Sequence, residues 1–171
     1  MPIFYDERVK TEWGGSAGAN WLDERLRIAQ PQLPARKPAF VEISRLDELR
    51  ALKNSTFDCT RLIAMCEELN DCAEHGNAHA VAMLTRAIVD HVPPLFGFSS
   101  FEQVAANYGG TKEKSFKKAM ERLDKHTKKV ADRLLHGQIT KSEVAPTMAE
   151  VSYSGEVNHL LSEVYRRLKN V

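Results

Sequence analysis

The stretch KSFKKAMERLDKHTKKVADRLLH, residues 114–136, decides the fold of this chain. Its apolar and small residues recur every three or four positions, which is the period of an amphipathic helix with one buried face. The inner stripe is formed by Phe116, Met120, Leu123, Thr127, Val130 and Leu134. Gly137 follows directly, so the sequence predicts one long helix over residues 114–136 that packs against other helices.

The same helical period returns on both sides of this segment. It predicts helices over residues 57–75, 78–92 and 155–169. Gly76 is expected to end the first of these helices, and Pro93-Pro94 the second. A shorter helix to about residue 108 is expected after the capping-box pattern Ser99-Ser100-Phe101-Glu102, and residues 138–154 are expected to form a loop. The predicted fold is all-α, a helical bundle of about five helices over residues 57–171.

Residues 1–56 differ in pattern and are predicted to form an extended N-terminal arm or linker with short helices. Short helical patterns lie at about residues 5–12 and 20–30, and three prolines at positions 31, 34 and 38 indicate an extended connector. Ala39–Ile43 could form a short strand, and Ser44 could begin a short helix that ends near Lys53. We expect this arm to dock on a protein partner.

Composition narrows the class of protein. The 171 residues suggest one domain, and the net charge of +1 gives no global attraction to nucleic acid or membrane. The three cysteines lie within one predicted helix, which favours reduced thiols over a disulfide framework. No signal peptide or membrane span is recognisable, so a cytoplasmic location is expected. No spacing indicates a metal site, a phosphate loop or another cofactor site.

One candidate catalytic pair is Arg86 and His91. A histidine can move a proton from a ribose hydroxyl while an arginine stabilises charge on the phosphate, as in metal-independent ribonucleases. The alternative is structural, because Arg86 and Asp90 are four residues apart and can form an ion pair on one helix face. Asp132 and His136 have the same spacing on the long helix. If the two helices pack together, a polar cluster could form from Arg86, Asp90, Asp132 and His136.

The long helix also carries a local excess of positive charge. Most of its lysines and arginines lie off the inner stripe and could contact the phosphates of RNA or DNA, although a solvated helix face is the simpler alternative. No aromatic residues alternate with them, so base stacking is not indicated. The candidate nucleic-acid-binding residues are Lys114, Lys117, Lys118, Arg122, Lys125, Lys128 and Lys129.

Residues 57–168 resemble bacterial helical domains of the HEPN superfamily (higher eukaryote and prokaryote nucleotide-binding), including abortive-infection and toxin–antitoxin proteins. The resemblance is carried by the segments Phe57–Asn70 and Ala80–Pro94 and by the pairs Ala131-Asp132 and Leu135-His136. It implies a homodimer in an anti-phage defence or stress system. Active members are endoribonucleases with an Arg-x4–6-His motif, a role that would fall on Arg86 and His91.

The chain departs from the active members in two ways. Ala87 follows the arginine, where active members commonly carry a polar residue, and the motif lies on the second main helix instead of late in the bundle. The favoured expectation is therefore a non-catalytic HEPN-like module for self-association or for nucleic-acid or partner binding. The alternatives are an active metal-independent endoribonuclease, and a helical adaptor with no nucleic-acid role.

Overall fold

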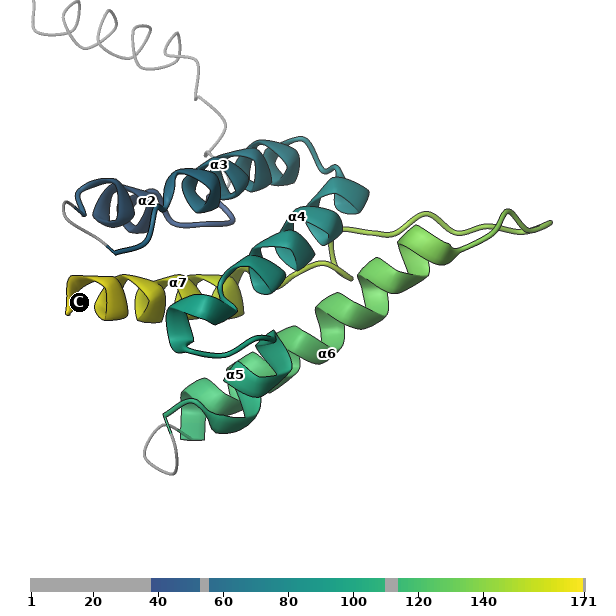
Figure 1. Cartoon of the computed structure of the whole chain (residues 1–171). Coiled ribbons are helices and arrows are strands. Elements are labelled where there is room, and N and C mark those ends of the chain that lie inside the picture. The colour runs from purple at the N-terminus through teal and green to yellow at the C-terminus, as the bar shows by residue number, and fades with distance from the viewer. Residues whose placement is uncertain (1–37, 53–55, 110–113, 171) are drawn as a thin grey trace, which may run out of the picture. The chain divides into compact units, whose positions relative to one another are not determined.

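The computed structural model describes residues 38–52, 56–109 and 114–170 (Figure 1). Within these ranges the chain forms α-helices and one 3-10 turn, and no strand. The all-α prediction is confirmed. The elements are α2 (Ile43–Arg50), α3 (Thr60–Glu74), α4 (Ala78–His91), η2 (Pro93–Phe96), α5 (Phe101–Asn107), α6 (Lys114–His136) and α7 (Ser154–Lys169).

Helix α4 occupies the middle of the bundle. It packs against α3 on one side and α6 on another, while α7 contacts both α6 and α2. The buried apolar side chains of all these helices form one core, and the threonines Thr85 and Thr127 are buried among them. Each hydroxyl donates a hydrogen bond of 2.7 Å to the carbonyl four residues earlier, so neither is an unpaired polar group.

The turn between α3 and α4 shows why the first predicted helix stops where it does. Gly76 has φ of +75°, a left-handed conformation that a side chain would strain. The Asn77 amide then donates to the Cys72 carbonyl at 2.9 Å, and the Gly76 amide to the Ala73 carbonyl at 3.2 Å. These two bonds form a Schellman motif, which satisfies the last carbonyls of α3 and reverses the chain into α4.

The start of α5 is capped one residue later than the pattern Ser99–Glu102 predicts, with Ser100 as N-cap instead of Ser99. The Ser100 hydroxyl accepts from the Gln103 amide at 3.4 Å, and the Gln103 side chain accepts from the Ser99 amide at 3.2 Å. The reciprocal capping residue is therefore Gln103, one position after the Glu102 of the predicted box. Before this cap, Pro93 begins η2, a short 3-10 turn that the sequence pattern did not reveal.

Helix α6 has the bounds that its pattern predicts. At its end the Gly137 amide donates to the Arg133 carbonyl at 2.9 Å, and a Cβ at position 137 would lie 2.6 Å from that carbonyl oxygen. Only glycine fits there without a shift of backbone. The chain then runs beyond the end of α6 as an irregular loop before it returns to α7 (Figure 1). Ile139 and Val144 on this loop are each 91% exposed.

The bundle includes residues that the sequence analysis assigned to the arm. Val41, Leu46 and Leu49 are buried in the common core, and the compact unit begins at Pro38. Ala39–Ile43 is not a strand, and α2 begins at Ile43 with Glu42 as its N-cap instead of Ser44. The other predicted features of the arm, in residues 1–37, lie outside the described residues, as does its expected role in docking a partner.

Two asparagines hold the segment of residues 40–42, and we call this arrangement the Asn clamp. Asn70 of α3 accepts from the Val41 amide at 2.7 Å and donates to the Val41 carbonyl at 2.9 Å. Asn158 of α7 accepts from the Glu42 amide and donates to the Phe40 carbonyl, each at 2.9 Å. The clamp supplies the hydrogen bonds that a neighbouring strand would have supplied, so the segment can be buried without pairing in a sheet.

Candidate nucleic-acid interface

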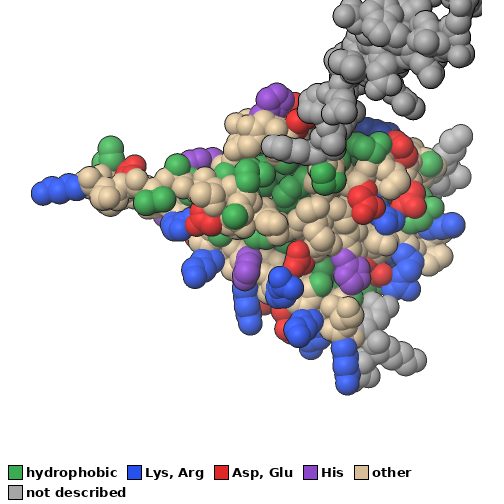
Figure 2. Space-filling view, turned by 180° about the vertical axis from the view of Figure 1, so that it is seen from behind, with side chains coloured by type: hydrophobic (Ala, Val, Ile, Leu, Met, Phe, Trp, Pro, Cys, Tyr) green, Lys and Arg blue, Asp and Glu red, His purple; other side chains and the backbone are tan. Residues whose placement is uncertain are grey.

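Helix α6 carries a row of exposed lysines on the side away from the core. We call Lys114, Lys118, Lys125 and Lys129 the lysine row; all four side chains are exposed. At about 100° and 1.5 Å per residue, these four positions lie within about 60° of one another and span about 22 Å. Figure 2 shows blue side chains gathered along the part of the surface that α6 forms.

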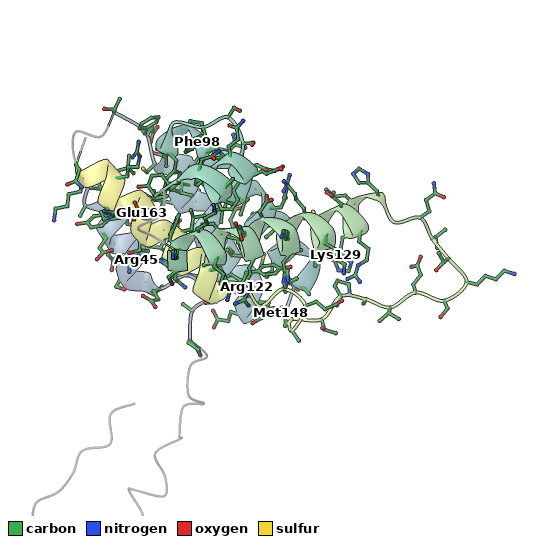
Figure 3. All side chains as sticks on the ribbon, turned by 90° about the horizontal axis from the view of Figure 1, so that it is seen from below. Arg45, Phe98, Arg122, Lys129, Met148 and Glu163 are labelled. Atoms are coloured by element: carbon green, nitrogen blue, oxygen red, sulfur yellow. The ribbon has the colours of Figure 1, made fainter. Side chains whose placement is uncertain are left out.

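The lysine row has no ionic partner within the described ranges, whereas Arg122, Lys128 and Arg133 of α6 each have one. Arg122 contacts Glu156 at 3.2 Å, Arg133 contacts Glu150 at 3.0 Å, and Lys117 is half-buried. Figure 3 shows Arg122 and Lys129 projecting from α6. The cations with partners join α6 to α7 and to the loop before it, so they serve the fold.

Lys128 is a partly buried cation of the helix. Its ammonium lies 3.0 Å from Asp124 in the preceding turn and 3.4 Å from Glu102 on α5. Partial burial lowers the pKa of Lys128, but hydrogen bonds to these two carboxylates outweigh burial and hold its pKa above the usual value. Lys128 is therefore protonated, but its charge is balanced by two carboxylates of the protein. Of the predicted basic residues, it offers the least attraction to an external anion.

Acidic residues interrupt the basic face at two places. Glu121 is half-buried beside the lysine row, and Asp132 is exposed about one turn after Lys129. Both reduce the local potential without contacting any lysine of the row through an ion pair in the described structure. The positive charge that is free to meet an external anion is thus concentrated between residues 114 and 129.

The structure separates the candidate catalytic residues. Arg86 and Asp90 form the ion pair expected of the structural alternative, with Nε and Oδ2 at 2.8 Å. His91 lies around the helix from this pair and lines a hollow of about 210 Å³ with Leu62, Leu95 and neighbouring residues. Arg86 does not line that hollow. Five positions apart, Arg86 and His91 lie on different sides of α4, and their catalytic role stays a prediction.

The predicted polar cluster also does not assemble. Helices α4 and α6 do pack together, but Asp132 and His136 are both exposed. No ion pair or hydrogen bond in the described ranges joins either residue to Arg86 or Asp90. Ala131 is the buried residue at this level of α6, so its neighbour Asp132 is turned away from the contact with α4.

A polar network that no sequence pattern indicates connects α5 to α7. Glu163 is only 8% exposed, and both of its oxygens accept hydrogen bonds of 2.7 Å from Arg166. The Tyr108 hydroxyl donates to the same carboxylate, and Arg167 lies over the Tyr108 ring. Burial raises the pKa of Tyr108, and the neighbouring carboxylate adds to this effect. Through these contacts Tyr108, at the C-terminal end of α5, is joined to Glu163 and Arg167 of α7.

Other kinds of site have little support in the described residues. No group of three potential metal ligands comes together there. The three cysteines are free thiols, and burial raises the pKa of Cys66 to about 12, which suppresses its reactive thiolate. None of the helices in the described ranges has the length and apolar character needed to cross a membrane.

No family model matches the chain, and neither a curated protein nor a solved structure matches it. The expected relationship to HEPN domains therefore stays a prediction that rests on the residues quoted for it.

Proposed function

We propose that this protein is a helical binding module that contacts the phosphate backbone of nucleic acid through the lysine row of α6. The observation that carries the proposal is the contrast between two sets of cations on one helix. Arg122, Lys128 and Arg133 each have a carboxylate partner, whereas the four lysines of the row have none in the described structure.

The arrangement suits phosphate contacts in charge and in spacing. Lys114 and Lys118 are separated by about 6 Å along the helix axis, as are Lys125 and Lys129. Such spacing lets successive ammonium groups reach successive phosphates of one strand. Contacts of this kind release condensed counterions, so binding falls steeply as salt rises and carries little base specificity. A module of this kind fits the non-catalytic role expected from the HEPN resemblance.

The test is binding of a fluorescently labelled, structured RNA in EDTA across a series of salt concentrations. The decisive variant changes Lys118, Lys125 and Lys129 to Gln, and we expect affinity to fall about tenfold or more because most of the phosphate contacts are removed. The control variant changes Arg61, Lys141 and Lys169 to Gln. It removes the same charge from other elements and should bind within about twofold of the wild type.

The same RNA also tests the nuclease alternative, because EDTA removes any metal-dependent contaminant. We expect the RNA to remain intact on a denaturing gel. Cleavage that disappears in both Arg86→Ala and His91→Ala would replace the binding module with a ribonuclease. Equal loss of binding in the two triple variants would show that total charge matters and not the lysine row.

A further inference from the structure

We infer that the ligand of the lysine row is double-stranded nucleic acid, in preference to single strands. This inference rests on the proposed function and adds the class of nucleic acid. It starts from the rigidity of the row, because its four lysines stand on one uninterrupted helix of 23 residues. A straight row of charges matches the regular backbone of a duplex, whereas a single strand must be straightened at an entropic cost to follow it.

The chemistry of the exposed face points the same way. Proteins that hold single strands combine positive charge with aromatic side chains on which the bases stack, at about 1–3 kcal/mol per base. α6 contains no Tyr or Trp, and its one Phe, Phe116, is buried and stacks edge-on with Tyr108 and His159. The exposed side of α6 therefore offers mainly ammonium groups, and its only rings are the imidazoles of His126 and His136, which are smaller stacking surfaces than Phe, Tyr or Trp.

Charge density supplies a quantitative expectation. A duplex carries more charge per unit length than a single strand and releases more counterions per phosphate neutralised. If the four lysines of the row each neutralise one phosphate, the slope of log K against log salt should be about −3.6 for a DNA duplex and about −2.8 for a single strand. At low salt, the duplex should bind several-fold more tightly.

The test measures anisotropy with four labelled probes of 24 nucleotides or base pairs, at 25 to 200 mM NaCl. The probes are a DNA duplex, an RNA duplex and an unstructured single strand of each kind. We expect both duplexes to bind at least about threefold more tightly than either single strand, and we expect this preference to vanish when Lys118, Lys125 and Lys129 are changed to Gln.

The outcomes separate the two proposals. Single strands that bind as tightly as duplexes, with the same loss in the triple variant, would overturn the preference for duplexes and leave the lysine row as a nucleic-acid site. Absence of binding to all four probes at 25 mM NaCl would overturn both. Duplex binding that the triple variant retains would place the contact elsewhere and likewise overturn both.

Discussion

Asn70→Ala is the substitution that most directly tests how the N-terminal segment of the bundle is held. Asn70 makes reciprocal hydrogen bonds of 2.7 and 2.9 Å with the amide and carbonyl of Val41, a residue with 0% exposure. The alanine variant leaves one buried donor and one buried acceptor without a partner. Each such group costs about 1–3 kcal/mol, so we expect a loss of about 2–4 kcal/mol once partial access of water is allowed for.

The assay is urea unfolding followed by circular dichroism at 222 nm, with Tm measured in parallel. For a chain of this length, a loss of about 2–4 kcal/mol corresponds to a fall in Tm of about 6–12 °C. Asn77→Ala is the matched control, because Asn77 is exposed and its side chain makes no capping bond to α4. We expect that control to stay within about 0.5 kcal/mol of the wild type.

The second asparagine of the clamp tests whether the segment behaves as a unit. Asn158→Ala should lower the free energy of unfolding, because it removes the hydrogen bonds to Phe40 and Glu42. The double variant with Asn70→Ala should lose less free energy of unfolding than the two single variants combined. Once one asparagine is removed and residues 40–42 detach, the hydrogen bonds of the other asparagine are already weakened or lost. Equal stability of Asn70→Ala and Asn77→Ala would refute the claim that these residues belong to the cooperative fold.

Three further outcomes follow from the structure. Hydrogen bonds from Thr60 lower the pKa of Asp58, so its contribution is present at neutral pH and is lost as pH falls through the lowered pKa. The difference in unfolding free energy between wild type and Asp58→Asn should therefore shrink below about pH 4, and a constant difference from pH 7 to 2.5 would contradict this. Cys66, with its pKa raised to about 12, should resist iodoacetamide at pH 8 until urea unfolds the protein, as judged by peptide mass spectrometry; equal labelling in both states would exclude its burial. Limited trypsin digestion should cut after Lys141 on the exposed loop, and Lys141→Gln should remove that fragment pair from the gel; an unchanged pattern would mean that the loop is protected.

The sequence was most informative where local pattern and burial coincide. The C-terminal end of α6 agrees with the prediction, because a long helix with one apolar face and a glycine directly after it leaves few alternatives. The Schellman turn at Gly76 was predictable for the same reason, since its bonds join residues close in sequence. Such features need no knowledge of how distant elements pack.

The Asn clamp could not be predicted in this way. Asn70 lies 29 positions from Val41, and Asn158 lies 118 positions from Phe40. Neither asparagine belongs to a helix-capping or turn motif. A polar residue on a helix is predicted to be exposed as long as its hydrogen-bond partner is unknown. The segment 40–42 was therefore assigned to an arm, although its own apolar residues were compatible with burial.

The predicted polar cluster of α4 and α6 failed because the contact between helices does not fix which residues face each other. The i, i+4 rule was sufficient for Arg86 and Asp90, which share one helix and do pair. Whether Asp132 meets that pair depends on how α6 is rotated about its own axis, which the sequence does not give. The stripe centred on Leu123 and Ala131 sets this rotation and turns Asp132 toward solvent.

The lysine row places like charges four residues apart on α6, and Glu121, within helical reach of Lys118 and Lys125, offsets part of their repulsion. Lys114 and Lys118, like Lys125 and Lys129, are like charges four residues apart, and each such pair destabilises a helix by about 0.2–0.5 kcal/mol. The neighbouring cations avoid this cost through their carboxylate partners. Changing Lys118, Lys125 and Lys129 to Gln should therefore leave stability unchanged or slightly raised while nucleic-acid binding is lost. A loss of both together would mean that the row supports the fold, and the argument for a phosphate contact would fail.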